Sequence, residues 1–238
     1  MKRNYSNISY AESPFGTLSE FMSKSFGWMF AGLLVTFGVG IGAVASGLIF
    51  PIINSGLFIF TSIAELVMVF VLSARVQKLQ PSTATALFFG YAVLNGINLS
   101  SIFLVYDYGT LILAFLVGAV YFGVMAVYGN VTDRDLTGWG PKLMMGLFAL
   151  IITGFVGMLF GMGFGSTVLY SGIGLVVFML LTAYDTQKLS QLYSYYAGDS
   201  ELAEKASIYG ALTLYLDFIN IFLYVVRLLG LNSRNSRS

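Results

Sequence analysis

The stretch TVLYSGIGLVVFMLLTAYDTQKL, residues 167–189, has no charged side chain before Asp185. A run of roughly 20 apolar residues is long enough to cross a bilayer as a helix. Six further apolar runs lie at about 25–50, 56–76, 83–106, 110–129, 142–162 and 208–230. These runs are continuously apolar rather than alternating, which disfavours a membrane barrel. We therefore expect an all-α integral membrane protein with seven transmembrane helices.

The composition indicates the same class of protein. Of the 238 residues, 57% are hydrophobic and 10% are charged, whereas a soluble domain carries roughly 25% charge. The net charge of +1 leaves no electrostatic footprint for nucleic acid. The predicted organisation is a polar N-terminal arm, a seven-helix transmembrane domain and a polar C-terminal tail, over residues 1–24, 25–230 and 231–238.

Missing residue types exclude several kinds of chemistry. The chain contains no cysteine and no histidine, which excludes disulfides, thiolate or imidazole metal sites and Ser-His catalysis. We expect no enzyme and no cofactor. An intramembrane aspartyl protease is the one enzymatic alternative, since Tyr184-Asp185 is present, but the expected glycine motif is missing at Asp217.

The distribution of basic residues predicts the orientation in the membrane. With the N-terminus in the cytosol, nine basic residues fall inside: Lys2, Arg3, Lys24, Arg75, Lys78, Arg134, Lys142, Lys188 and Lys205. Only Arg227, Arg234 and Arg237 fall outside. Because cytosolic loops are enriched in Lys and Arg, we expect a cytosolic N-terminus and an external C-terminus in a cell membrane.

Three acidic residues, Glu65, Asp185 and Asp217, lie within apolar runs. A charge at the bilayer centre costs about 2.5–3.5 kcal/mol even on the most lenient scale. Two carboxylates in a medium of low dielectric cannot both ionise cheaply, so a pair would exchange its proton as a unit. We predict that Asp185 and Asp217 form such a pair in the cytosolic half, with Arg75 balancing its charge. The alternative is that each acid separately pairs with a Lys, Arg or Tyr and only locks helices together.

Polar residues at helical spacing accompany these acids. Asn95, Asn98 and Ser101 share one face of the third run, and Thr182 shares a face with Asp185. The last run has a polar stripe formed by Tyr209, Thr213, Asp217, Asn220, Tyr224 and Arg227. Together with Glu65, the residues Asn95, Asn98 and Asn220 are candidates for lining a cavity or pore.

Two segments resemble the Bax inhibitor-1 family: Ala183-Tyr184-Asp185-Thr186-Gln187 and Tyr215-Leu216-Asp217-Phe218-Ile219-Asn220-Ile221-Phe222. Asn95-Gly96-Ile97-Asn98-Leu99-Ser100 is similar to a segment in the family's third span. The Tyr128-Gly129, Thr132, Asp135-Leu136 and Gly138 pattern is similar to its short connecting motif. The resemblance implies that the last helix is central, surrounded by the other six. It also implies that Asp185 and Asp217 are the family's paired aspartates, with Arg75 as its nearby arginine and Glu65 as its second-span acid.

The resemblance implies a pH-dependent calcium leak, and links some bacterial relatives to regulation of a membrane protease. The acidic connection with Asp199, Glu201 and Glu204 and the short tail without lysines favour a bacterial plasma membrane. We predict a pH-sensitive cation leak for calcium, in which Asp185 and Asp217 sense protons and transiently contact the ion through oxygens that calcium prefers. The alternatives are a modulator of a membrane protease or other membrane partner, and a proton-coupled cation exchanger.

Overall fold

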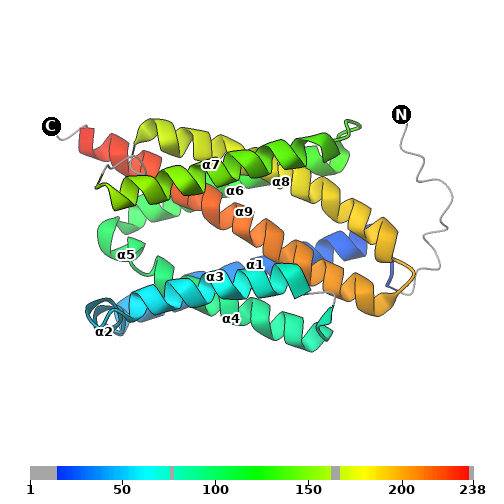
Figure 1. Ribbon diagram of the computed structural model, residues 1–238, viewed down its shortest axis with the longest axis horizontal. Coiled ribbons are helices and arrows are strands. Elements are labelled where there is room, and N and C mark those ends of the chain that lie inside the picture. The colour runs from blue at the N-terminus through cyan, green and yellow to red at the C-terminus, as the bar shows by residue number, and fades with distance from the viewer. Residues whose placement is uncertain (1–14, 76–77, 162–166, 236–238) are drawn as a thin grey trace. The chain divides into compact units, whose positions relative to one another are not determined.

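The computed structural model describes residues 15–75, 78–161 and 167–235. Figure 1 traces the helices in chain order, from α1 in blue to α9 in orange and red. The elements are α1 (Leu18–Ala45), α2 (Ile49–Asn54), α3 (Leu57–Arg75), α4 (Pro81–Leu99), α5 (Ile102–Val105), α6 (Tyr108–Val131), η3 (Thr137–Trp139), α7 (Gly140–Leu159), α8 (Val168–Tyr196) and α9 (Ser200–Asn235).

The prediction of seven membrane-spanning helices is confirmed. Within the described ranges, seven segments are long and apolar enough to cross a bilayer, and each contains one of the predicted runs at least in part. Their side chains suit lipid as well: Phe60 and Phe70 of α3 are 69% and 70% exposed, and Leu169 of α8 is 74% exposed. Apolar surface of this kind is stable only where the surroundings are also apolar.

The first helix begins before the predicted first span, which starts at about residue 25. Helix α1 begins at Leu18, inside the segment 1–24 that we expected to be a polar arm. The reason is a capping box, in which the Thr17 hydroxyl accepts from the Glu20 backbone N–H and Glu20 accepts from the Thr17 backbone N–H. The helix ends at Ala45 rather than near residue 50, and Gly47 follows at φ +75°. Glycine adopts this left-handed conformation at little cost.

The last helix extends beyond the predicted last span, 208–230, on both sides. Helix α9 begins at Ser200, because the Asp199 carboxylate accepts the backbone N–H groups of Glu201 and Leu202, both at 3.0 Å. The segment interpreted as an acidic connection is therefore the first turn of a helix. At its other end α9 runs to Asn235, into the predicted tail 231–238. The predicted basic residues Lys2, Arg3 and Arg237 lie outside the described residues.

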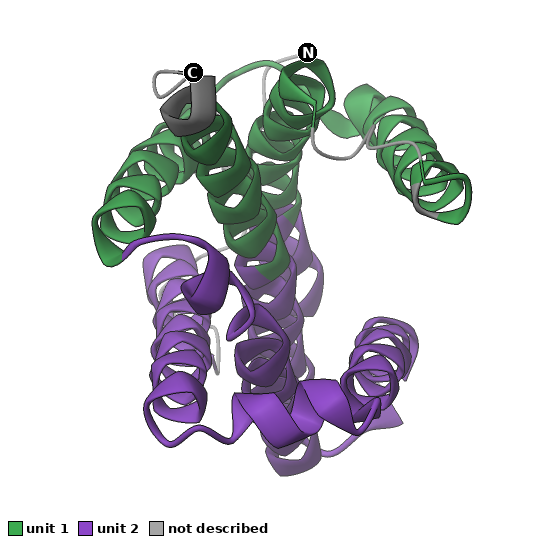
Figure 2. Cartoon of the chain, turned by 90° about the vertical axis from the view of Figure 1, so that its left-hand side faces the viewer, with its two compact units in different colours: residues 1–3, 108–188, 216–238 green, residues 4–107, 189–215 purple. Residues whose placement is uncertain are grey.

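The chain divides into two compact units, coloured separately in Figure 2. One unit contains residues 108–188 and 216–238, and the other contains residues 4–107 and 189–215, apart from those not described. Helices α8 and α9 contribute to both units. In α9, 56% of the most apolar window is buried, against at most 39% in any other span. That the other six helices surround α9 stays a prediction.

The unit formed by α1, α3, α4 and the adjoining parts of α8 and α9 packs around Tyr215. The rings of Phe88 and Tyr91 meet the Tyr215 ring edge-on, at centroid distances of 5.8 and 5.7 Å. The hydroxyl groups of Tyr215 and Thr36 lie 2.6 Å apart, and Thr36 also donates to the Ala92 carbonyl. These contacts join the first, third and last spans through buried polar groups, each of which has a partner.

The unit formed by α6, α7 and the remaining parts of α8 and α9 packs around Phe218 and Tyr224. The Phe218 ring contacts Phe115 and Phe122 of α6 edge-on, at 5.4 and 5.6 Å. The Tyr224 ring contacts Tyr170 of α8, at 6.1 Å. Aromatic rings prefer these edge-on and tilted geometries. Packing of this kind fixes the rotation of α9 in this unit, and therefore the direction in which Asp217 points.

Candidate functional site

Asp185 of α8 and Asp217 of α9 belong to the same unit and lie within electrostatic reach of each other. Asp217 is almost completely buried, at 3% exposure, whereas Asp185 is half-buried. The structure therefore brings together the two residues that the sequence predicted as a pair. Lys188, one helical turn after Asp185, is the cation that acts most strongly on Asp185.

The hydroxyl of Thr182 completes this site. It donates to the Phe178 carbonyl at 2.8 Å, and it also forms a hydrogen bond with the Asp217 carboxyl. A hydroxyl has one hydrogen to donate. This hydrogen can serve either the Phe178 carbonyl or the Asp217 carboxyl, so Thr182 links α8 to α9 beside the pair.

The second carboxyl oxygen of Asp217 is the least satisfied atom of the site. Within the described part of the chain, Asp217 Oδ2 is buried and has no hydrogen-bond partner. Leaving a buried polar atom without a partner costs about 1–3 kcal/mol, and more when the group is charged. Acidic residues that are retained within membrane spans at such a cost commonly mark functional sites.

Two other predicted residues have different surroundings. The side-chain amide of Asn220 donates to the Leu216 carbonyl of its own helix at 2.8 Å, so this donor serves α9 itself. Arg75 is the last residue of α3, is exposed, and belongs to the unit that does not contain the aspartates. Its part in balancing the aspartate pair stays a prediction, as does pore lining by Asn220.

Glu65 and the two asparagines of α4 form a second polar cluster, in the other unit. Asn95 and Asn98 each donate a side-chain N–H to one oxygen of the Glu65 carboxylate. Asn98 also accepts from the Thr61 hydroxyl at 2.7 Å, and Asn95 contacts the Tyr91 hydroxyl at 3.4 Å. The structure thus brings together three predicted residues as a hydrogen-bonded clamp between α3 and α4. Whether they line a pore stays a prediction.

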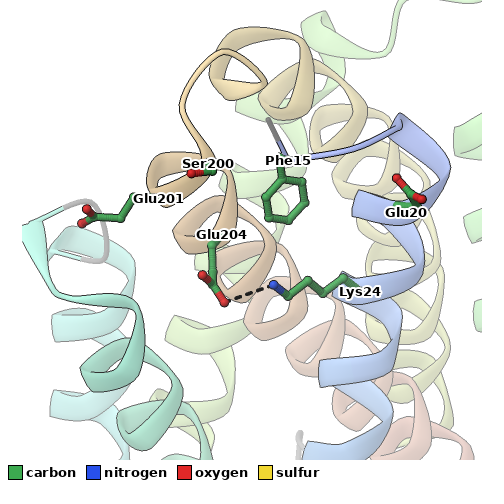
Figure 3. A pocket seen from close by; sticks show the side chains of 6 residues that line it. All are labelled: Phe15, Glu20, Lys24, Ser200, Glu201 and Glu204. Atoms are coloured by element: carbon green, nitrogen blue, oxygen red, sulfur yellow. Dashed lines mark hydrogen bonds and ion pairs between the residues drawn. The ribbon is translucent and has the colours of Figure 1, made fainter. Parts of the chain in front are cut away.

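A cavity of about 390 Å³ lies beside the first turns of α1 and α9, lined by Phe15, Glu20, Lys24, Ser200, Glu201 and Glu204 (Figure 3). Lys24 pairs with Glu204 at 3.1 Å, and Glu201 pairs with Lys205 at 2.6 Å. Glu20 belongs to the capping box of α1. Each acidic side chain of this cavity therefore already has a partner, and the cavity lies in the unit without the aspartate pair.

The oxygen ligands around the aspartates are few. Among the residues that the structure describes, no group of three or more acidic side chains is arranged to hold a metal ion. Calcium usually takes six to eight oxygen ligands. That Asp185 and Asp217 transiently contact a calcium ion stays a prediction.

Sequence reasoning missed several contacts at both clusters. It did not connect Tyr91 or Tyr215 with Glu65, or Thr61 with Asn98, because helical spacing shows which residues share a face but not which face of another helix they meet. It also missed the role of Gln187. This buried amide is the last residue of the motif that contains Asp185, and a fully buried polar side chain calls for specific partners.

The similarity to known proteins covers the part of the chain that contains these motifs. The sequence model of the family described as "Inhibitor of apoptosis-promoting Bax1" matches residues 18–234. The inner membrane protein YbhL of Escherichia coli is 42% identical over 221 residues, which are 91% of this chain and 94% of that protein. An uncharacterized protein of Borreliella burgdorferi is 39% identical over 216 residues, covering 89% and 92% of the two chains. One of Deinococcus radiodurans is 42% identical over 221 residues, covering 91% and 90%. Together with the seven apolar helices, these matches support a multi-pass location in a cell membrane.

Proposed function

The chain belongs to the Bax inhibitor-1 family, and on that premise we propose that it is a pH-sensitive cation leak for calcium, gated by Asp185 and Asp217. The observation that carries this proposal is the environment of Asp217. Its carboxyl is almost fully buried, one oxygen has no hydrogen-bond partner, and a second carboxyl lies within electrostatic reach. In a chain without histidine, this pair is the natural group to respond to protons inside the membrane.

The gating step follows from the charges of the pair. When the two carboxyls share one proton, a hydrogen bond between Asp185 and Asp217 can hold α8 and α9 together at these residues. Loss of that proton leaves two negative charges in a medium of low dielectric, where their repulsion is strong. The separated carboxylates then offer oxygens to a cation, and Lys188 limits the excess negative charge. Proton binding and ion binding thus compete for the same two side chains.

The proposal is tested by measuring calcium flux into liposomes that contain the purified protein, over a series of pH values. The flux should vary with pH, and Asp185→Asn and Asp217→Asn should each remove that variation. Asp133→Asn, which neutralises an exposed aspartate in the connection before α7, serves as the matched control and should keep the wild-type profile. An unchanged profile in both variants of the pair would reject the gate.

The same preparation separates the alternatives. A proton flux stoichiometrically linked to calcium movement would identify a proton-coupled exchanger that uses the same pair. An absence of flux, combined with recovery of a membrane protease bound to the protein, would favour a modulator of that partner. In that case the aspartates would only stabilise helix contacts.

A further inference from the structure

The buried side chain of Gln187 joins α8 to the connection between α6 and η3. Its Oε1 accepts from the Leu136 backbone N–H at 2.8 Å, and its Nε2 donates to the Arg134 carbonyl at 2.9 Å. Gln187 and Leu136 are each 1% exposed. The amide therefore satisfies two backbone groups of segment 132–136 at once, as a neighbouring strand would.

Two glycines allow the chain on either side of segment 132–136 to pack closely against residues 183–187 of α8. A Cβ on Gly129, near the end of α6, would lie 2.1 Å from the Ala183 carbonyl oxygen. A Cβ on Gly140, at the start of α7, would lie 2.6 Å from the Tyr184 ring. The chain before and after the connection is thus packed against residues 183–187, and the Gln187 hydrogen bonds lie between these two close contacts.

The position of Asp185 in this turn makes the arrangement relevant to the gate. Ala183 and Gln187 are four residues apart and share one face of α8. Asp185 lies two residues from each, about 200° around the helix, so it projects from the opposite face. Thr182 lies near Asp185 in rotation and meets Asp217 of α9. One face of the turn is therefore held by the connection, while the other presents Asp185 to its partner.

We propose that Gln187 is a positioning residue, which sets the rotation of the α8 turn and hence the approach of Asp185 to Asp217. This inference rests on the proposed function for its physiological meaning, but its geometry is independent of any ion flux. Without Gln187, segment 132–136 would leave the turn and the turn could rotate. The electrostatic interaction between the two carboxyls would then change.

The charged and titratable groups around this turn are few. Asp217 faces Asp185 from α9, and Lys188 acts on it from α8. Lys188 also lies over the Tyr184 ring, 5.8 Å from its centroid. The connection contributes Asp133, Arg134 and Asp135, which are all exposed. None of these groups is removed by a change at Gln187, so an effect on Asp185 would come from its position.

The first measurement asks whether Gln187 holds the connection. Since the chain has no cysteine, Leu136→Cys provides a single buried thiol without removing the backbone N–H. We expect this thiol to resist a maleimide reagent in the otherwise wild-type protein and to react at least about tenfold faster with Gln187→Met, because burial limits thiol reactivity. Gln191→Met, at an exposed glutamine one turn further along α8, is the matched control and should leave the thiol protected.

The second measurement follows the protonation of the Asp185 carboxyl. Dicyclohexylcarbodiimide adds to a protonated carboxyl: the acid proton moves to nitrogen, a carboxyl oxygen bonds to the central carbon, and acyl migration leaves a stable N-acylurea. Labelling of Asp185 against pH, read by mass spectrometry, therefore reports its protonation without ion flux. We expect Gln187→Met to shift the midpoint by about half a pH unit or more, and Gln191→Met to leave it in place. Gln187→Asn adds no charge, and its amide is one methylene too short to reach both the Leu136 N–H and the Arg134 carbonyl, so it should also shift the midpoint.

An Asp185 midpoint that is unchanged in both Gln187 variants would overturn the inference, whether or not the Leu136→Cys thiol becomes reactive. A shifted midpoint in a protein that conducts no calcium would support the positioning role and reject the proposed leak. If Gln187→Met does not fold, Gln187→Asn and its Asp185 midpoint decide the question.

Discussion

Asn95 of α4 donates its side-chain amide to the carboxylate of Glu65 on α3. A second amide, from Asn98, binds the other carboxylate oxygen. An acid in an apolar helix is thus held by two neutral donors from a neighbouring helix. Hydrogen bonds between helices in a membrane contribute about 0.6–2 kcal/mol each. This relationship explains how the chain retains Glu65 within a helix as apolar as α3.

The clamp predicts a coupling between Glu65 and Asn98. Asn98→Leu should lower the free energy of unfolding by about 1–3 kcal/mol, because it leaves a carboxylate oxygen without its donor. The same change in a Glu65→Leu background should cost much less. A double-mutant cycle from thermal unfolding in detergent measures this difference. The exposed Asn54→Leu is the control, and additive effects of Glu65→Leu and Asn98→Leu would contradict the clamp.

The threonine beside the aspartates predicts a selective effect on gating. Thr182 and Thr186 are both fully buried, and each donates to a carbonyl four residues earlier in α8. Thr182 also contacts Asp217. Thr182→Val should therefore shift the pH midpoint of calcium flux. Thr182→Ser, which keeps the hydroxyl, should leave the midpoint at its wild-type value. Thr186→Val should leave the midpoint unchanged, and equal shifts in the two valine variants would show that Thr182 has no special role.

The close approach of α6 and α8 predicts a large cost for one added methyl group. Gly129→Ala would place a Cβ 2.1 Å from the Ala183 carbonyl oxygen, a backbone atom that cannot rotate away. We expect a loss of about 3 kcal/mol of stability, measured by thermal unfolding in detergent. Gly123→Ala, in the same helix, meets nothing within 4 Å and should be neutral or stabilising by up to about 1 kcal/mol. Similar stability of the two variants would argue against the contact.

The predicted orientation can be checked with single cysteines. A membrane-impermeant maleimide applied to intact cells should label Ser55→Cys, in the connection after α2, and should label Asp133→Cys only after permeabilisation. Both positions are exposed, so accessibility depends on the side of the membrane. Labelling of Asp133→Cys in intact cells would show that the orientation is the opposite of the predicted one. A tag at the C-terminus that is reachable only from the cytosol would contradict the external C-terminus.

Helix ends show where sequence reasoning reached its limit. The apolar run predicted a span starting near residue 208, but the Asp199 side chain caps the helix and starts α9 at Ser200. At the other terminus, Thr17 and Glu20 start α1 within a segment that composition alone classed as polar. Hydropathy detects where a helix meets lipid, whereas caps decide where it begins. A polar helical turn outside the membrane has no hydropathy signal.

By itself, the sequence determined the class of the protein, its seven spans and the identity of its unusual residues. Continuous apolar runs have no other stable arrangement in a bilayer, and carboxylates within them are costly enough to stand out. Only the tertiary structure decided which groups meet. It brought Asp185 and Asp217 into electrostatic reach, joined Glu65 to two asparagines, and assigned Gln187 to the connection before α7. Helical spacing specifies the faces of one helix, whereas packing between helices, set by contacts such as Gly129 against Ala183, specifies which faces touch.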